Sequence, residues 1–159
     1  MAHDTWSFVR AAALDALTPL PASPEVDAAV AGALKDPAAR VRVASATSLG
    51  TRHAVAFGGA LRARVDDKDE DLEVRVAATR ALGDTCHTPS LDRLTELARG
   101  AASPASDADV QIGMAALDAL GKLHPKDLAQ RLATFENPAI PASARKMAAQ
   151  AIEAKGMCR

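Results

Sequence analysis

One arrangement of apolar and polar positions returns along the whole chain. An acidic residue is followed five positions later by a branched aliphatic residue, which begins an alanine-rich run closing on leucine. The four clear copies begin at Asp4 and Val9, Asp36 and Val41, Asp69 and Val74, and Asp107 and Ile112. A degenerate fifth copy covers residues 144–156, and successive copies are spaced by 32, 33, 38 and 32 residues. A period in the thirties indicates stacked repeats, each of which buries its apolar face against its neighbours.

The apolar positions inside one copy follow a helical period. Val74, Ala77, Ala78, Ala81 and Leu82 occupy positions i, i+3, i+4, i+7 and i+8, which form one face of a helix. The pattern predicts five such helices, over residues 5–17, 37–50, 70–83, 107–121 and 141–156. Shorter, leucine-based helices are predicted between them, over residues 23–35, 53–65, 89–99 and 125–135.

Glycine follows the last periodic residue in four of the five long helices. These glycines are Gly50, Gly83, Gly121 and Gly156. Because a helix often ends on a residue in the left-handed conformation, which glycine adopts without strain, we expect them to be C-caps.

Composition supports helices and excludes some partners. The 48% of hydrophobic residues is dominated by alanine, the best helix former, and only four of the 159 residues are aromatic. Lys and Arg number 19 against 20 Asp and Glu, so no net field favours nucleic acid or an anionic membrane. No apolar run approaches the roughly 20 residues that cross a bilayer. The first residues resemble no signal peptide, so a cytoplasmic location is expected.

The two cysteines, Cys86 and Cys158, fall in corresponding loops two repeats apart. Helical layers about 8–10 Å apart would separate them by roughly 20 Å, beyond the ~7 Å limit for a disulfide. We therefore expect free thiols, since only a loose C-terminal tail could bring the two together.

Residues 36–44 and 69–78 resemble the HEAT repeat in its bacterial, HEAT-like form. Each has an acidic residue, then Val-Arg, at Val41-Arg42 and Val74-Arg75, and an alanine-rich helix ending in Leu-Gly. The resemblance implies an all-α fold, a right-handed α-solenoid of about nine helices in which the alanine-rich helices are the inner ones. It implies one domain over residues 1–159, with a lone first helix over 4–18 and pairs over about 23–50, 53–83, 88–121 and 125–156. The family serves protein or peptide contacts and implies no single activity.

The repeated charges have a structural and a functional interpretation. Asp36, Arg42, Asp69 and Arg75 are expected to form a ladder of caps and ion pairs between repeats, although they could bind anionic ligands. The fourth copy has Gly113 where arginine is expected, which predicts a gap in that ladder.

No chemistry of catalysis or metal binding is evident. His53, His87 and His124 occupy matching turns, but repeats roughly 10 Å apart cannot share an ion whose Zn–N bonds are about 2 Å. The His-Glu pairs by which the HEAT-like deoxyhypusine hydroxylase holds iron do not occur. HEAT-like DNA glycosylases need a basic face with aromatic residues, which this chain does not offer. No catalytic residue, cofactor or metal is predicted.

A candidate partner-binding surface lies on the long helices, opposite the predicted buried face. Three positions in each long helix point away from the core. At two of these positions the residues are mostly apolar over four repeats, whereas solvent-facing positions are usually polar. The predicted contact residues are Val43, Val76, Thr79, Arg80, Met114, Leu117 and Asp118. Such a surface suits an extended peptide or a partner helix. The alternative is that strong curvature buries these side chains inside the solenoid.

The leading hypothesis is a non-catalytic, monomeric scaffold or adaptor that binds a protein or peptide, and neither nucleic acid nor membrane, on its concave face. The second is a helical-repeat appendage of a larger bacterial enzyme. Trp6 and Phe8 are large apolar residues in the first helix, and they are expected either to fill the first layer or to pack on a preceding domain. The third is a HEAT protein with bilin lyase-like activity.

Overall fold

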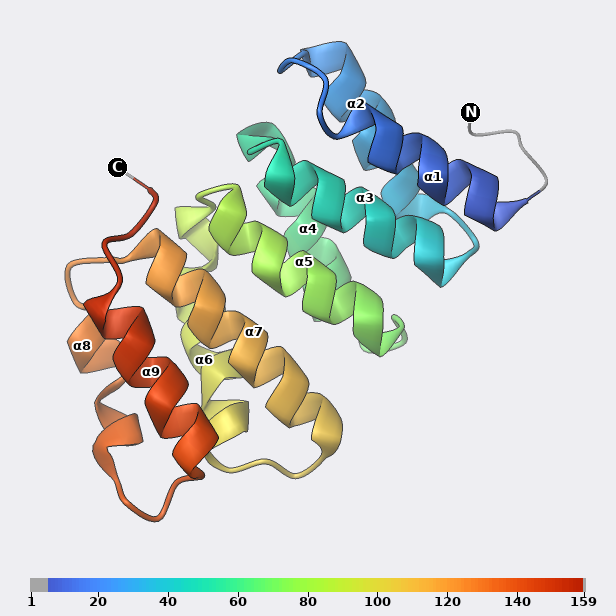
Figure 1. The fold of residues 1–159 in the computed structure, drawn as a ribbon. Coiled ribbons are helices and arrows are strands. Elements are labelled where there is room, and N and C mark those ends of the chain that lie inside the picture. Colours follow the sequence, from blue (N-terminus) through green and yellow to red (C-terminus); the bar gives the residue numbers. More distant parts are fainter. Residues whose placement is uncertain (1–5, 159) are drawn as a thin grey trace.

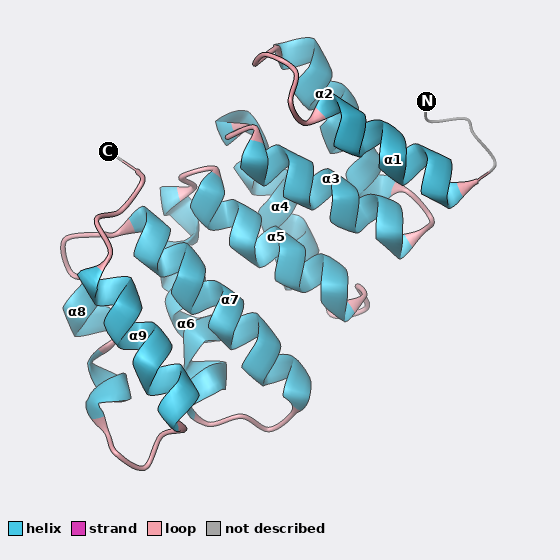
Figure 2. Ribbon diagram, in the orientation of Figure 1, coloured by secondary structure: helices cyan, strands magenta, loops and turns pink. Residues whose placement is uncertain are grey.

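The computed structural model describes residues 6–158, and within that range every regular element is helical, with no β-strand (Figure 2). Five long helices carry the repeated pattern: α1 (Ser7–Leu17), α3 (Ala39–Thr51), α5 (Leu72–Asp84), α7 (Asp107–Leu123) and α9 (Ala142–Glu153). Four further helices alternate with them: α2 (Pro24–Gly32), α4 (Gly58–Asp66), α6 (Leu91–Ala102) and the short α8 (Leu128–Arg131). The all-α prediction is confirmed for this part of the chain. Asp4, the acidic residue of the first copy, lies outside the described residues.

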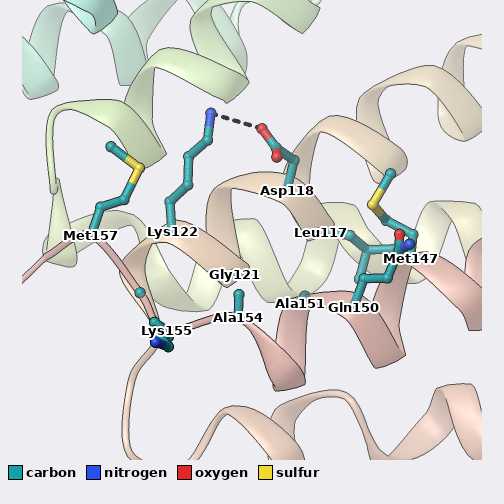
Figure 3. A pocket seen from close by; sticks show the side chains of 11 residues that line it. Leu117, Asp118, Gly121, Lys122, Met147, Gln150, Ala151, Ala154, Lys155 and Met157 are labelled. Carbon is teal, nitrogen blue, oxygen red and sulfur yellow. Dashed lines mark ion pairs between the residues drawn. The ribbon is translucent and has the colours of Figure 1, made fainter.

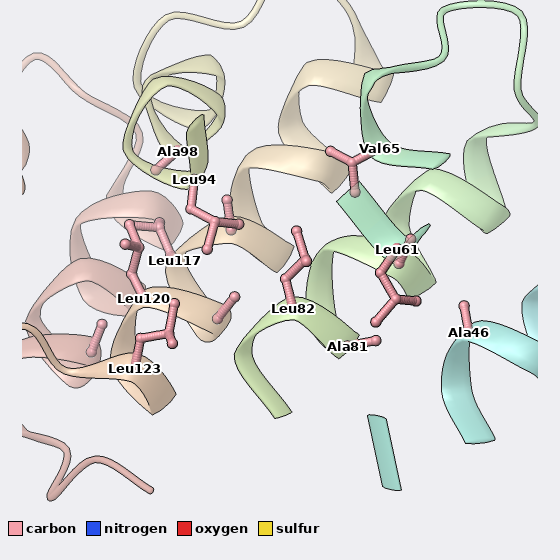
Figure 4. Packing of buried hydrophobic residues seen from close by; sticks show 14 of the residues in the cluster. Ala46, Leu61, Val65, Ala81, Leu82, Leu94, Ala98, Leu117, Leu120 and Leu123 are labelled. Carbon is pink, nitrogen blue, oxygen red and sulfur yellow. The ribbon is translucent and has the colours of Figure 1, made fainter. Parts of the chain in front are cut away.

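The long helices lie side by side in one row. Each packs against the next, α1 on α3, α3 on α5, α5 on α7 and α7 on α9 (Figure 1). The intervening helices form a second layer behind the row, with α2 on α3, α4 on α5 and α6 on α7. Leucine fills the space between the layers. Leu82 and Leu120 from the row and Leu61 and Leu94 from behind lie in one cluster (Figure 4). Leu49 of α3 belongs to the same cluster, and none of these five side chains has exposed surface.

Glycine has a different role from the predicted one at three of the four repeat ends. Gly50, Gly83 and Gly121 lie inside α3, α5 and α7, where a Cβ atom would be tightly crowded by the next long helix. A Cβ atom on Gly83 would lie 2.6 Å from the Cα of Ala119, and the corresponding distance is 3.0 Å from Gly121 to Ala151. The C-cap prediction is wrong for these residues, because the glycines allow neighbouring long helices to approach closely. Gly156, with φ of 66°, does take up the left-handed conformation.

The left-handed turn falls three residues after each of these glycines, on His53, Cys86 and His124, with φ of 51°, 53° and 43°. Two of the three side chains reach the end of the next long helix. His53 Nδ1 lies 2.8 Å from the carbonyl oxygen of Asp84, and His124 Nε2 lies 3.1 Å from that of Ile152. His53 and His124 therefore link consecutive units of the row. A side chain in the left-handed conformation strains the backbone, and these contacts offset that strain.

Candidate partner-binding face

A hollow of about 390 Å³ opens on the exposed side of the row, along α5 between α3 and α7. Its apolar lining comes from Val43, Val76 and Ala77, all of them partly buried. Polar groups surround this lining: Thr47, Thr51, Glu73, Arg80, Asp84, Gln111 and Lys122. Three of the predicted contact residues, Val43, Val76 and Arg80, thus line one surface, and Met114 on α7 is likewise partly buried.

Two predicted contact residues are not on this face. Thr79 and Leu117 have no exposed surface, and so their assignment as partner contacts is wrong. Ala46, which occupies the matching position in α3, is buried as well. A helix in the middle of the row packs on a neighbour at each side and on the second layer behind. Its buried arc is therefore much wider than the single apolar stripe assumed from the sequence.

The charges on this face are unevenly paired. Lys122 Nζ lies 2.8 Å from Asp84 Oδ1 and 2.9 Å from Asp118 Oδ2, so it connects α7 to α5. Burial alone would lower the pKa of Lys122, but the two carboxylates outweigh it and raise that pKa. Arg80, by contrast, is exposed and forms no ion pair within the described part of the chain. Of the two predicted polar contacts, Asp118 pairs with Lys122, whereas Arg80 has no such ion pair among the described residues.

A second hollow of about 400 Å³ lies between α7 and α9 (Figure 3). Leu117, Gly121, Met147 and Ala151 form its apolar part, and Lys122 connects it to the first hollow. One wall of this second hollow is the segment that follows α9, through Lys155, Gly156 and Met157.

Ion pairs between repeats join an arginine of one long helix to the acidic residues just before the next long helix. Arg10 of α1 donates through Nε and Nη2 to the two carboxylate oxygens of Asp36, both at 2.7 Å. Arg42 of α3 donates to Glu70 at 2.6 Å and to Asp71 at 2.7 Å, and its Nη1 binds the carbonyl oxygen of Asp36 at 2.8 Å. Asp36 and Arg42 thus each take part in an ion pair between repeats.

The acidic partner of Arg42 is not Asp69, which is exposed and makes no side-chain ion pair with the described residues. Its neighbour Glu70 takes that role, with a side chain 2% exposed. Burial would raise the pKa of Glu70, but hydrogen bonds from Arg42 and from the backbone N–H of Asp71 outweigh it and lower that pKa. The hydrogen bonds from Arg10 likewise lower the pKa of Asp36.

The ladder does not continue beyond α5. Arg75 Nε donates to the carbonyl oxygen of Val65 at 3.2 Å, so this arginine joins α5 to α4 rather than to the next repeat. At Gly113, a Cβ atom would lie 2.5 Å from the backbone nitrogen of Ala101. The fourth copy therefore has glycine in place of arginine where α7 packs closely on α6.

One structural arginine was missed in the sequence. Arg52, whose side chain is 1% exposed, pairs with Asp27 at 2.6 Å and donates to the carbonyl oxygens of Leu17, Leu20 and Pro21. It fixes the chain between α1 and α2. No arginine occupies the matching place after α5 or α7, so the repeat pattern carried no signal for it.

The prediction of free thiols is wrong. Cys86, in the turn after α5, forms a disulfide with Cys158, with Cα atoms 5.5 Å apart. After α9 the chain does not continue away from the stack but turns back across the end of α7. There the N–H groups of Met157 and Cys158 donate to the carbonyl oxygen of Lys122, at 2.8 and 3.4 Å. The estimate from repeat spacing failed because Cys158 belongs to this returning tail.

Among residues 6–158, no three His, Cys, Asp or Glu side chains are placed to hold a metal ion. None of the helices in that range combines the length and apolar character needed to cross a membrane. The chain matches no protein-family model, and no curated protein shows a significant sequence match to it.

Proposed function

We propose that this chain is a non-catalytic scaffold, a HEAT-like α-solenoid whose long-helix face binds a protein or peptide. The supporting observation is the hollow along α5, where a partly buried apolar lining, Val43 and Val76, adjoins the unpaired cation of Arg80. Apolar area supplies affinity for a partner, and an unpaired guanidinium selects one with a carboxylate. The row of five long helices makes this face long, and repeat proteins use such extended faces to bind partners.

The test begins with a photo-crosslinking amino acid at Thr47, which is exposed on this face. A matched probe at Ala60, exposed on α4 in the second layer, reports nonspecific contacts. A partner crosslinked from Thr47 and not from Ala60 is then purified and its affinity measured by calorimetry. Val76→Glu and Arg80→Glu should each weaken binding at least tenfold, while Ala60→Glu leaves it unchanged.

Circular dichroism and thermal melting of each variant separate a lost contact from a lost fold. If Val76→Glu binds the partner normally while folded, the long-helix face is not the binding surface. If it fails to fold, Val76 is a core residue, and Arg80→Glu alone decides the matter, because that side chain is exposed.

A second candidate, an appendage of a larger enzyme, is favoured by α1. Val9 is 38% exposed, whereas its repeat equivalents Val41 and Val74 are at most 1% exposed. Trp6 and Phe8 beside it are 65% and 56% exposed, with ring centroids 5.8 Å apart. A face built of core-type residues is suited to docking on another domain. An open reading frame fused in frame before Met1 would support this candidate, and Phe8→Ser would then loosen the domain contact without altering binding at Arg80.

The cytoplasmic location expected from the sequence stays a prediction, and the disulfide favours an oxidising compartment instead. Alkylation of intact cells with a maleimide, before and after reduction, measures the state of Cys86 and Cys158. Thiols that react without reduction would place the protein in a reducing compartment.

A further inference from the structure

The tail after α9 follows a course that depends on few contacts. Beyond Glu153 the backbone becomes extended at Ala154 and reverses through Gly156, whose φ is 66°. A side chain at Gly156 would collide with His124, so the tail lies directly on the turn that ends α7. Its ordered hydrogen bonds are the two from Met157 and Cys158 to the single carbonyl of Lys122.

The noncovalent contacts of this tail are weak. Lys155 is exposed and Met157 is 54% exposed, so neither buries much apolar surface. The sulfur of Cys158 lies 3.6 Å from the carbonyl oxygen of Gly83, a weak contact at most. A segment with two backbone hydrogen bonds and little burial opens readily by itself. The bond to Cys86 is therefore the contact that keeps the tail in place.

The same tail closes one end of the hollow between α7 and α9. Lys155, Gly156 and Met157 form that wall, opposite Leu117 and Met147 (Figure 3). Removing the tail would leave the hollow open at that end.

We propose that the Cys86–Cys158 bond is a thiol–disulfide exchange site that acts as a latch, and that a dithiol reductant opens it. A thiolate of the dithiol attacks one sulfur and forms a mixed disulfide, releasing the other cysteine as a thiol. The second thiol of the reductant then resolves the mixed disulfide, so that the reductant leaves as a cyclic disulfide and both cysteines become thiols. Both cysteines are partly exposed, which gives the reductant access. With the bond broken, the tail from Ala154 onward detaches while the helices described between Ser7 and Glu153 stay folded.

Hydrogen exchange read by mass spectrometry or NMR tests the latch on the whole chain, oxidised or reduced with dithiothreitol. The amides of Met157 and Cys158 should exchange about tenfold faster or more after reduction, since each is protected by one hydrogen bond. The amides of α5 should keep their protection. Cys158→Ser should behave like the reduced protein without any reductant.

Unchanged exchange at Met157 and Cys158 after reduction would overturn the proposal, because the tail would then be held without the bond. Faster exchange at the amides of α5 would also overturn it, since reduction would then unfold the helices rather than release the tail.

Discussion

The close approach of the long helices can be tested by replacing single glycines with alanine. Helix propensity alone predicts that every such replacement stabilises the protein, whereas the structure predicts stabilisation at one glycine and destabilisation at another. Glycine inside a helix costs about 1 kcal/mol relative to alanine, so replacing any exposed helical glycine should stabilise the protein. Gly59, on α4, has open space where its Cβ would be. Gly59→Ala, in the first turn of α4, should therefore raise the free energy of unfolding by up to about 1 kcal/mol.

Gly83→Ala should do the reverse. Its Cβ would lie 2.6 Å from the Cα and 3.1 Å from the carbonyl oxygen of Ala119, both backbone atoms that no rotamer change can move. Separating α5 from α7 to admit the methyl group costs about 1–3 kcal/mol as overpacking and lost packing elsewhere along the contact. After the gain of about 1 kcal/mol in helix propensity, a net loss of up to about 2 kcal/mol remains.

The assay is urea unfolding followed by circular dichroism under non-reducing conditions, with thermal melting as a check. One kcal/mol corresponds to about 2–4 °C in a protein of this size. Gly121→Ala, with a clearance of 3.0 Å to Ala151, should fall between the two. If Gly83→Ala were as stabilising as Gly59→Ala, the long helices would not be in the close contact described above.

Three further outcomes are expected. Glu70→Ala should lower the free energy of unfolding by about 2 kcal/mol or more because Arg42 loses its most buried partner, whereas Asp69→Ala should change it by less than about 0.5 kcal/mol; equal effects in urea unfolding would contradict the assignment of the ladder. Cys86→Ser, Cys158→Ser and the double variant should each lower that free energy by the same amount, up to about 4 kcal/mol for a bond spanning 72 residues, and additive losses in calorimetry would mean that the cysteines act separately. The lowered pKa values of Asp36 and Glu70 stabilise the fold above their ordinary pKa values of 3.8 and 4.5, and this stabilisation is lost as the pH falls through the lower, folded-state values. Glu70→Gln should thus flatten the dependence of unfolding on pH below about pH 5, and an unchanged slope would show that the Glu70 carboxylate is not stabilised by folding.

The helical periodicity of the sequence was enough to predict the helices and the order in which they alternate. The side chains at Val41, Val74 and Ile112 are buried as that pattern requires. Periodicity on one helix could not reveal how many sides of that helix are covered, so Thr79 and Leu117 were placed on the wrong surface. That depends on neighbours in the row and behind it, which a single repeat does not encode.

The disulfide and the ladder show two other limits. Repeat spacing gives distances between equivalent positions, and Cys158 is not equivalent to anything, because the chain reverses after the last helix. Asp69 and Glu70 are adjacent acidic residues, and the repeat alignment selects the first whereas the reach of the Arg42 side chain selects the second. In both cases the deciding factor is the local path of the backbone.

The turns that end α3, α5 and α7 each link their helix to another part of the row. His53 and His124 each contact a backbone carbonyl of the next long helix, whereas Cys86 is bonded to the tail that follows α9, two long helices further along the row. The disulfide therefore closes the chain from the end of α5 through α7 and α9 into one covalent loop, while α1 and α3 stay outside that loop. Under a pulling force, the α1 end of the row should for this reason separate before the α9 end.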